Sequence, residues 1–403
     1  MMTPSFYTAD PSSGQLKFPQ DPQKPFVVVH KSFLDVIGKQ PKLRMLAKSD
    51  SLGQRAFHEA GIYIRKDNEV YLTSNLVHDP DARNQISKIK LSALEEGKTV
   101  DNSWEDVSTQ PEVVTGNGGT IWGDKLLLCS QGLGQEIPSA LWLVDPYPPY
   151  NATNILNNFH GRPFNAINDV VILPAPSDDP AVPHPTTCRT DIHHLPHTTI
   201  WFTDPTYGFV QGYKPRPLLP NQVYCFNPTT GDVRCVADGL KMPNGLCFNW
   251  EGTKLYVTDT GAVTIKPGET SFSADSAEPA TIYVYDVVRP SHCADLTAEG
   301  PTLHNKRVFA FADCGVPDGI KTDRAGNVYS GCGDGIHVWN AAGTLIGKVI
   351  LPPDAVPSQW PSTDPAHKHR LSANFCFADN KLVIFAQDRI YEATLGENTL
   401  GAI

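Results

Sequence analysis

The sequence predicts an all-β protein made of six copies of one repeat, a β-propeller or a solenoid. In each copy, a residue with a side-chain oxygen opens a short apolar segment, and a second strand-like segment follows. The copies begin at Glu59, Asn117, Asn168, Asn244, Asp318 and Asn374. Alternating apolar residues are separated by turn sequences such as Thr229-Thr-Gly-Asp and Arg324-Ala-Gly-Asn, which is typical of short antiparallel strands.

The elements follow in order from the N-terminus. Residues 1–25 are rich in Pro, Ser and Gln and indicate an irregular N-terminal tail. Residues 41–58 indicate an outer strand, which in a closed ring is expected to complete the last blade. A four-stranded unit needs about 40–50 residues, so the wide spacing of the third to fifth copies predicts loop insertions. No shift in composition divides residues 26–403, which we interpret as a single domain.

Composition narrows the classes of partner. The net charge is −10 and the pI is about 5.7, and the absence of a basic patch argues against a nucleic acid partner. The apolar runs are no longer than strands, which predicts no transmembrane helix. Residues 1–10 lack a basic segment and an apolar segment, so a cytoplasmic location is expected unless a leader has been removed, in which case the protein would be secreted. The sequence does not indicate an oligomeric state.

Several familiar sites are missing. Cys129, Cys247, Cys332 and Cys376 lie in predicted strands and are expected to be buried, and no Cys-x-x-Cys pair suggests a zinc site. Leu128-Cys-Ser-Gln-Gly lacks the first glycine of a nucleophile elbow. His58 and Glu59 are not followed by the second histidine of a zincin helix, and no helix follows Gly331-Cys-Gly-Asp-Gly. Serine-hydrolase and dehydrogenase functions are therefore disfavoured.

The residues that open the copies form a candidate cation site. In a ring, equivalent positions converge on the axis, and Glu59 and Asp318 would supply carboxylates there while Asn168 and Asn244 would supply amide oxygens. Oxygen ligands without thiolate or imidazole favour Ca²⁺, Mg²⁺ or Mn²⁺ over Zn²⁺. The alternative is that these residues only shape turns, because Asn-Gly and Asp-Gly are common turn dipeptides.

A second metal site is an open alternative in the proline-rich insertion at 174–197. This segment carries four histidines, at His184, His193, His194 and His197. The strand pattern does not fix the geometry of the insertion, so a polar surface loop is the simpler interpretation.

Longer strings carry a resemblance to a known family. They are Phe57-His-Glu-Ala, Pro138-Ser-Ala-Leu-Trp-Leu, Asn168-Asp-Val, Phe202-Thr-Asp-Pro-Thr-Tyr-Gly-Phe, Pro243-Asn-Gly-Leu-Cys-Phe-Asn-Trp-Glu-Gly-Thr-Lys-Leu-Tyr-Val-Thr-Asp, Val316-Pro-Asp-Gly-Ile and Gly331-Cys-Gly-Asp-Gly-Ile-His-Val-Trp-Asn. From about residue 26 to the end, the chain resembles the gluconolactonase/senescence-marker-protein-30 (regucalcin-like) family, closest to its fungal lactonohydrolase members. The resemblance implies a six-bladed β-propeller with four-stranded antiparallel blades, a divalent cation in the central tunnel, commonly Ca²⁺, and hydrolysis of small lactones.

The resemblance also implies roles for particular residues. Glu59 matches the family's first-blade metal ligand, Asn244 the Asn of its Pro-Asn-Gly motif, and Asp318 the Asp of its Pro-Asp-Gly motif. Asn168 matches the Asn of an Asn-Asp motif that binds metal or substrate in different members. Animal members have Arg two residues earlier, where this chain has Ala166, so their specificity is not transferable.

These expectations define a mechanism. A cation-bound lactone carbonyl would be attacked by water, with Asp318 as the first candidate for the general base and His58 as the second. Because neighbouring side chains alternate on a strand, His58 reaches the site only if the chain bends there. Asp204 and Asp259 end outward strands and are expected mainly to brace loops, while Tyr207, Phe209 and Trp122 are candidates for lining the substrate pocket.

The resemblance implies hydroxylated lactones of the aldonolactone or pantolactone type as substrates, with Mg²⁺, Mn²⁺ or Zn²⁺ as alternatives to Ca²⁺.

Three other functions compete with lactone hydrolysis. An arylesterase of the paraoxonase kind would use the same ligands, since carbonyl and phosphoryl oxygens both suit a hard Lewis acid. A non-catalytic binding propeller would not need carboxylates in the tunnel, and a strictosidine-synthase-like enzyme would not need the cation.

Overall fold

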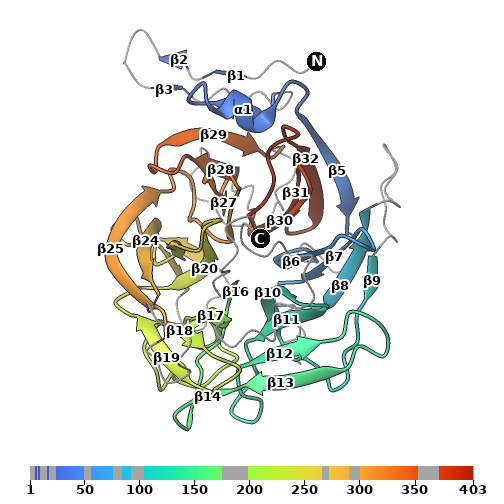
Figure 1. Ribbon diagram of the computed structural model, residues 1–403, viewed down its shortest axis with the longest axis vertical. Coiled ribbons are helices and arrows are strands. Elements are labelled where there is room, and N and C mark those ends of the chain that lie inside the picture. The colour runs from blue at the N-terminus through green and yellow to red at the C-terminus, as the bar shows by residue number, and fades with distance from the viewer. Residues whose placement is uncertain are drawn as a thin grey trace.

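Six blades are arranged in a ring around a central axis in the computed structural model (Figure 1). The structure describes residues 24–49, 56–75, 84–91, 104–174, 198–265, 272–289, 300–352 and 372–402, with short strands at 5–6, 8–9 and 16–17. Each blade contains four antiparallel strands, and the first strand of each blade lies innermost. This confirms the predicted six-bladed β-propeller.

The first three blades each use consecutive strands. Blade 1 contains β6 (Glu59–Ile64), β7 (Glu69–Thr73), β8 (Ile86–Lys90) and β9 (Trp104–Asp106). Blade 2 contains β10 (Gly116–Trp122), β11 (Lys125–Ser130), β12 (Ala140–Val144) and β13 (Ala152–Leu156). Blade 3 contains β16 (Val170–Leu173), β17 (Thr199–Asp204), β18 (Gln222–Phe226) and β19 (Val233–Ala237).

The other three blades complete the ring. Blade 4 contains β20 (Pro243–Phe248), β21 (Lys254–Asp259), β24 (Thr281–Val288) and β25 (Thr302–Phe311). Blade 5 contains β26 (Ile320–Thr322), β27 (Val328–Cys332), β28 (Gly335–Trp339) and β29 (Leu345–Ile350). Blade 6 contains β30 (Asn374–Ala378), β31 (Lys381–Ala386), β32 (Arg389–Thr394) and β5 (Lys42–Lys48).

The smaller elements are hairpins, short strands and two short helices. The hairpins pair β14 (Asn158–Phe159) with β15 (Arg162–Pro163), β22 (Val263–Ile265) with β23 (Phe272–Ala274), and β2 (Thr8–Ala9) with β3 (Leu16–Lys17). The remaining elements are β1 (Ser5–Phe6), β4 (Phe26–Val28), α1 (Phe33–Ile37) and α2 (Tyr207–Val210). No helix in the described part of the chain is long and apolar enough to cross a membrane.

The ring closes by pairing the two ends of the chain. The N-terminal strand β5 pairs antiparallel with β32, with Lys42 opposite Thr394 and Lys48 opposite Arg389. This confirms that the strand predicted in residues 41–58 completes the last blade. Blade 5 is also extended outward, because β4 pairs with β29 and β1 pairs with β4. Segments from near the start of the sequence therefore hold the last two blades.

The hydrophobic core is divided among the interfaces between neighbouring blades. On β31, Leu382 and Ile384 pack toward blade 5, whereas Val383 and Phe385 pack toward blade 1. Because side chains alternate across a strand, a strand covered on both faces must be apolar at consecutive positions. The same rule places Cys129, Cys247, Cys332 and Cys376 in the interior, where all four are buried and free, as predicted.

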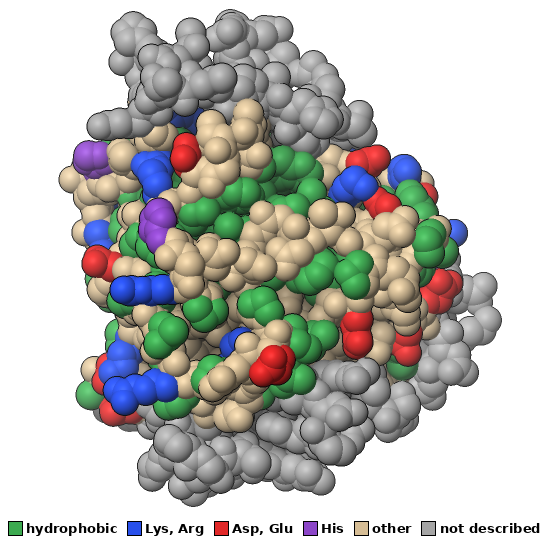
Figure 2. Space-filling model, turned by 90° about the horizontal axis from the view of Figure 1, so that it is seen from below, with side chains coloured by type: hydrophobic (Ala, Val, Ile, Leu, Met, Phe, Trp, Pro, Cys, Tyr) green, Lys and Arg blue, Asp and Glu red, His purple; other side chains and the backbone are tan. Residues whose placement is uncertain are grey.

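The outer surface carries charges of both signs. On the face seen in Figure 2, the described lysine and arginine side chains lie in small groups among acidic and apolar groups. The insertion with its four histidines lies outside the described residues.

Candidate metal centre

The six residues that open the copies meet at one end of the tunnel, where hydrogen bonds link neighbouring blades. Thr73 Oγ1 donates to the carbonyl of Asn117 at 2.9 Å, and Asn117 Nδ2 donates to the carbonyl of Asn168 at 3.0 Å. Thr203 Oγ1 then donates to the Asn244 carbonyl at 2.6 Å, and Thr258 Oγ1 to the Asp318 carbonyl at 2.9 Å.

The ring of contacts is completed across blades 5, 6 and 1. The amide of Gly319 donates to the carbonyl of Ala373 at 2.8 Å, and Asn374 Nδ2 donates to Glu59 Oε2 at 2.8 Å. Each opening residue is therefore held by the blade beside it, so its position depends on the closed ring rather than on local sequence alone.

Glycines after the opening residues allow this close approach. Gly118 and Gly245 lie within β10 and β20 and do not have positive φ, so the turn interpretation of Asn117 and Asn244 is wrong. A Cβ at Gly118 would lie 2.4 Å from the carbonyl oxygen of Asn168. A Cβ at Gly245 would lie 2.5 Å from that of Asp318. Glycine is needed here for contact between blades, not for turning.

Three of the predicted site residues come together at this end of the tunnel. Ligand atoms of His58, Glu59 and Asp318 all lie within 4.8 Å of one another. His58 Nε2 is 3.8 Å from Glu59 Oε1, and His58 Nδ1 is 3.0 Å from Nε2 of Gln387. The chain departs from a regular strand just beyond them, where Ala60 and Gly61 have positive φ and the register shifts. From the sequence, His58 is expected to reach the site only if the chain bends beside it, and the structure contains such a bend.

Buried oxygens without donors mark the site as suited to a cation. Asn168 Oδ1, Asp169 Oδ2 and Asp318 Oδ1 are buried and have no hydrogen-bond partner among the described residues. Leaving a buried acceptor unpaired costs about 1–3 kcal/mol. A hard divalent cation would satisfy such oxygens, and the carboxylate and amide donors are the types that Ca²⁺ accepts. The residues present therefore fit the implied ion.

The electrostatics of the cluster lead to the same conclusion. Burial raises the pKa of Glu59 above its ordinary value, and the charges of Asp318 and Asp169 raise it further. Burial and then the charge of Asp169 raise the pKa of Asp318 to about 7, although Asn244 opposes the shift. Burial also raises the pKa of Asp169, with Lys321 as the main opposing charge. These carboxyls repel one another, so without a cation the cluster holds protons.

Asp169 was missed by the sequence analysis. The Asn168-Asp169 dipeptide was interpreted only through its asparagine. Regular pairing in blade 3 begins at Val170, so both residues precede the strand. The sequence signal for Asp169 was an acidic residue directly after the opening residue Asn168.

Asp204 and Asp259 brace the site from behind, as expected. The carboxylate of Asp204 accepts the backbone N–H groups of Asn165 and Ala166, both at 2.9 Å. The carboxylate of Asp259 accepts those of Lys241 and Met242, both at 2.8 Å. In each blade the two donors lie three and two residues before the opening asparagine, so the same device positions Asn168 and Asn244.

The predicted aromatic residues divide between the site and the core. Tyr207, on α2, has its hydroxyl 3.1 Å from Asn244 Nδ2 and also hydrogen bonded to Thr260. Burial, and then the charge of Asp318, raises the pKa of Tyr207. Phe209 is 42% exposed, whereas Trp122 is buried in the core between blades 2 and 3 and does not line the site.

The fold and the cluster define a class: six-bladed β-propellers with a carboxylate and amide site in the tunnel. Residues 178–277, in blades 3 and 4, match the family described as the SMP-30/Gluconolactonase/LRE-like region. This stretch of the chain is therefore similar to that family. The matched range includes Asn244 but not Glu59, Asn168 or Asp318.

A curated relative is similar to this chain over a longer stretch. Lactonohydrolase oryL of Aspergillus oryzae is 30% identical over 306 residues, which span 72% of this chain and 60% of that protein. The chain therefore spans less than two thirds of the length of each of three curated relatives, taken in order of similarity: 60% of the first, 27% of the second and 48% of the third.

Solved structures support the fold. A gluconolactonase of Xanthomonas campestris superposes with a TM-score of 0.61 at 19% identity, covering 92% of this chain and 95% of that chain. Regucalcin of Agrobacterium tumefaciens, described as a calcium-binding protein, has a TM-score of 0.50 at 13% identity, covering 89% and 97%.

Proposed function

We propose that this protein hydrolyses small hydroxylated lactones to hydroxy acids at the cluster in the tunnel. The observation that carries the proposal is the group of buried, unpaired oxygens of Asn168, Asp169 and Asp318 beside His58 and Glu59. The names of the relatives, a lactonohydrolase and a gluconolactonase, support lactones as the substrate class.

Glu59, Asn168, Asn244 and Asp318 would hold a hard divalent cation, because every donor is oxygen, and Ca²⁺ is the ion that we propose. When bound, such an ion supplies Lewis-acid stabilisation of the negative charge that develops on the carbonyl oxygen. Asn374 fixes Glu59 by donating to Oε2, which leaves Oε1 directed toward His58. Asp169 adds negative charge to the site and is a candidate fifth ligand.

Hydrolysis also needs a base for the attacking water, and Asp318 is the first candidate. Its Oδ1 is buried and unpaired, so it can accept a proton without losing an existing hydrogen bond. Without a cation its pKa is raised to about 7, and a bound cation would lower that pKa and keep the carboxylate charged and able to accept a proton from water. The amide of Asn244 stabilises the charged form of Asp318.

His58 is the second candidate for the base. Gln387 holds its Nδ1 at 3.0 Å, which leaves Nε2 facing the cluster. An imidazole is the side chain whose ordinary charge change falls nearest neutral pH, and its place beside Glu59 puts it within reach of a water in the cluster. The two candidates differ in their test: Asp318→Asn would also weaken the cation site, whereas His58→Gln would lower turnover with little change in cation affinity.

Specificity for hydroxylated rings would come from polar groups around the cluster. The hydroxyl of Tyr207 is part of a network with Asn244 and Thr260, and it can exchange hydrogen bonds with a substrate hydroxyl. Ala166 leaves no arginine clamp at the position where animal relatives have one. A substrate with hydroxyl groups rather than a carboxylate suits this lining, which favours aldonolactones or pantolactone.

The direct test is hydrolysis of a panel of hydroxylated lactones by the purified protein, by Glu59→Gln and by Glu397→Gln. Glu397 is exposed and far from the cluster in sequence, so it controls for the chemical change alone. We expect Glu59→Gln to lower kcat/KM by about a hundredfold or more and Glu397→Gln to have no effect. Equal activity of both variants would contradict the assignment of the site.

A further inference from the structure

The tunnel has a second pocket at its other end. A cavity of about 240 Å³ is lined by residues of all six innermost strands, each two or more positions after the opening residue of its blade. With a strand rise of about 3.3 Å per residue, it begins roughly 7 Å or more beyond the acidic cluster. Gly401 bridges to Asp323, and the amide of Ala402 donates to the carbonyl of Thr322, so the C-terminal segment forms one wall.

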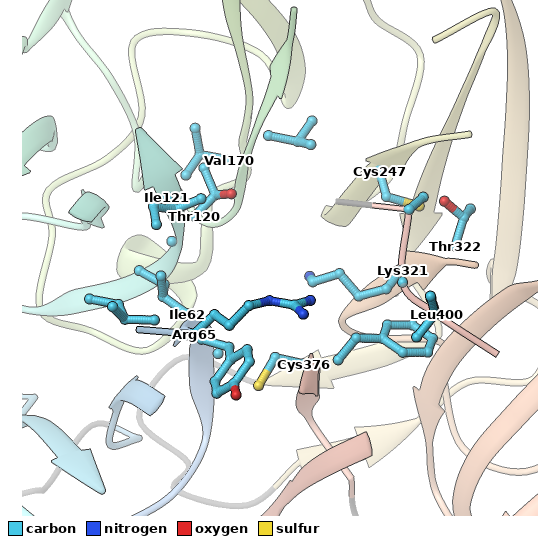
Figure 3. Close-up of a pocket in the computed structure, with 18 of the residues that line it drawn as sticks. Ile62, Arg65, Thr120, Ile121, Val170, Cys247, Lys321, Thr322, Cys376 and Leu400 are labelled. Carbon is cyan, nitrogen blue, oxygen red and sulfur yellow. The ribbon is translucent and has the colours of Figure 1, made fainter. Parts of the chain in front are cut away.

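Cationic side chains surround this pocket. Figure 3 shows Lys321 and Arg65 extending from opposite walls toward its middle. Lys66 and Arg324 also line it, while the two acidic lining residues, Asp124 and Asp379, are exposed at its rim. The charge here is opposite to that of the acidic cluster.

Lys321 differs from the other three cations because no described residue pairs with its ammonium group. Arg65 Nη1 pairs with Asp379 at 2.6 Å. Lys66 lies over the Tyr147 ring and Arg324 over the Trp250 ring, with distances to the ring centroids of 4.7 and 4.6 Å. Lys321 is half-buried, and in the described part of the chain no hydrogen bond or ion pair engages its ammonium group.

The neighbouring thiols do not supply the missing negative charge. Cys247 and Cys376 line the same pocket as Lys321. Burial raises the pKa of Cys376 to about 12, with Lys321 only partly opposing the shift, and burial also raises the pKa of Cys247. Both thiols are therefore neutral near pH 7. The ammonium group of Lys321 is therefore available to pair with an anion that enters the cavity from solution.

We propose that this second pocket binds the oxyanion group of a small molecule, a carboxylate or a phosphate, with Lys321 as its principal contact. The volume is below the roughly 300–1,000 Å³ of pockets for drug-sized ligands, so the ligand is small. Arg65 can contribute from the rim, because its guanidinium has donors beyond the one paired with Asp379. This inference does not depend on the proposed lactonase activity.

The test is calorimetric titration of the full chain with sodium phosphate and, separately, with sodium gluconate, at constant ionic strength in chloride and without added divalent cation. The variants are Lys321→Gln, Arg65→Gln and the control Lys39→Gln, which removes the same charge from an exposed lysine. We expect Lys321→Gln to weaken binding at least about tenfold, as for the loss of a hydrogen bond to a charged group. Arg65→Gln should weaken it less, and Lys39→Gln should leave it unchanged.

Glu59→Gln separates the two ends of the tunnel. If the anion occupies the second pocket, this variant binds phosphate or gluconate at least as well as the wild type does, even if its lactone hydrolysis is lost. Tighter binding of phosphate would identify a phosphate ligand, and tighter binding of gluconate a carboxylate. Absence of binding by the wild type, or binding unaffected by both Lys321→Gln and Arg65→Gln, would overturn the proposal. Arg65 is exposed, so we expect Arg65→Gln to fold. This variant therefore still tests the pocket if Lys321→Gln does not fold.

Discussion

At the scale of single residues, the site is governed by the crowding of Glu59, Asp169 and Asp318 in a buried place. Burial raises the pKa of each carboxyl, and neighbouring carboxylates raise it further for Glu59 and Asp318 but not for Asp169. A group whose pKa is raised by folding stabilises the folded protein at low pH and loses that contribution as the pH rises through the folded value. A bound cation would stabilise the charged form of these carboxyls, so cation binding and proton release are coupled.

This coupling predicts how cation binding depends on pH. For Asp318 the window runs from its ordinary value of 3.8 to about 7. We expect the melting temperature of chelator-treated protein to fall as the pH rises across this window. We expect the increase caused by added Ca²⁺ to be small at pH 5.5 and large at pH 8. Differential scanning calorimetry with and without Ca²⁺ measures both, and a Ca²⁺ effect that is equal at the two pH values would contradict the coupling.

Prediction from sequence succeeded in part for where the candidate site residues lie, while their roles as ligands stay predictions. Glu59 and Asp318 are together as expected, because equivalent positions in a ring converge on its axis. The position of His58 depended on a bend that alternation along a strand does not reveal, and Asp169 was hidden for the same reason. The irregular backbone at the start of these strands depends on contacts with a neighbouring blade. The sequence of one strand does not show such contacts.

At the scale of elements, each innermost strand is positioned by its neighbours. Asp204 and Asp259 end the second strands of blades 3 and 4, and each holds the backbone just before an opening asparagine. Threonines on the second strands of blades 1, 3 and 4 hold the opening residue of the following blade. The bracing role was predictable from the position of the two aspartates, but the threonine contacts were not, because they join different blades.

The brace in blade 4 gives a stability prediction. Asp259→Asn places an amide N–H group against backbone donors, so we expect a loss of about 1–3 kcal/mol in the free energy of unfolding. The affinity for cation should fall as well, because Asn244 is no longer held. Asp232→Asn, at an exposed turn, is the matched control and should change stability by less than about 0.5 kcal/mol. Urea unfolding of both variants measures the difference, and equal stabilities would argue against the brace.

The glycine between blades 4 and 5 gives a packing prediction. Gly245→Ala would place a Cβ against the backbone of Asp318 and Ile320, at 2.5 and 3.0 Å. We expect a destabilisation of about 1–3 kcal/mol or more and weakened cation binding, because blade 5 must move. Gly231→Ala is the comparison: Gly231 has positive φ but open space, so only about 1–2 kcal/mol of backbone strain is expected, without an effect on the cation. An unchanged cation affinity in Gly245→Ala would show that this contact does not set the site.

At the scale of the whole molecule, ring closure unites the two ends of the sequence at the site. The pairing of β5 with β32 completes blade 6, and the contact of Asn374 with Glu59 joins blade 6 to blade 1. The number of blades, their order and this closure could all be predicted, because the repeat and its displaced first strand are visible in sequence. The pocket around Lys321 could not, because it exists only where all six innermost strands end together.

The opposite charges at the two ends of the tunnel also belong to this scale. Acidic groups gather where the innermost strands begin, and Lys321 lies farther along the same axis. Lys321 opposes the pKa shifts of Glu59 and Asp169, so the two ends influence each other electrostatically.

The measurement that tests the account most directly is lactone opening followed by pH-stat, before and after removal of divalent cations with EDTA. Ca²⁺, Mg²⁺, Mn²⁺ and Zn²⁺ would then be added back one at a time. The account predicts that hydrolysis of a hydroxylated lactone disappears on chelation and returns with one hard cation, most fully with Ca²⁺. Hydrolysis that persists in thoroughly chelated protein, or no hydrolysis by folded and cation-loaded protein, would contradict it.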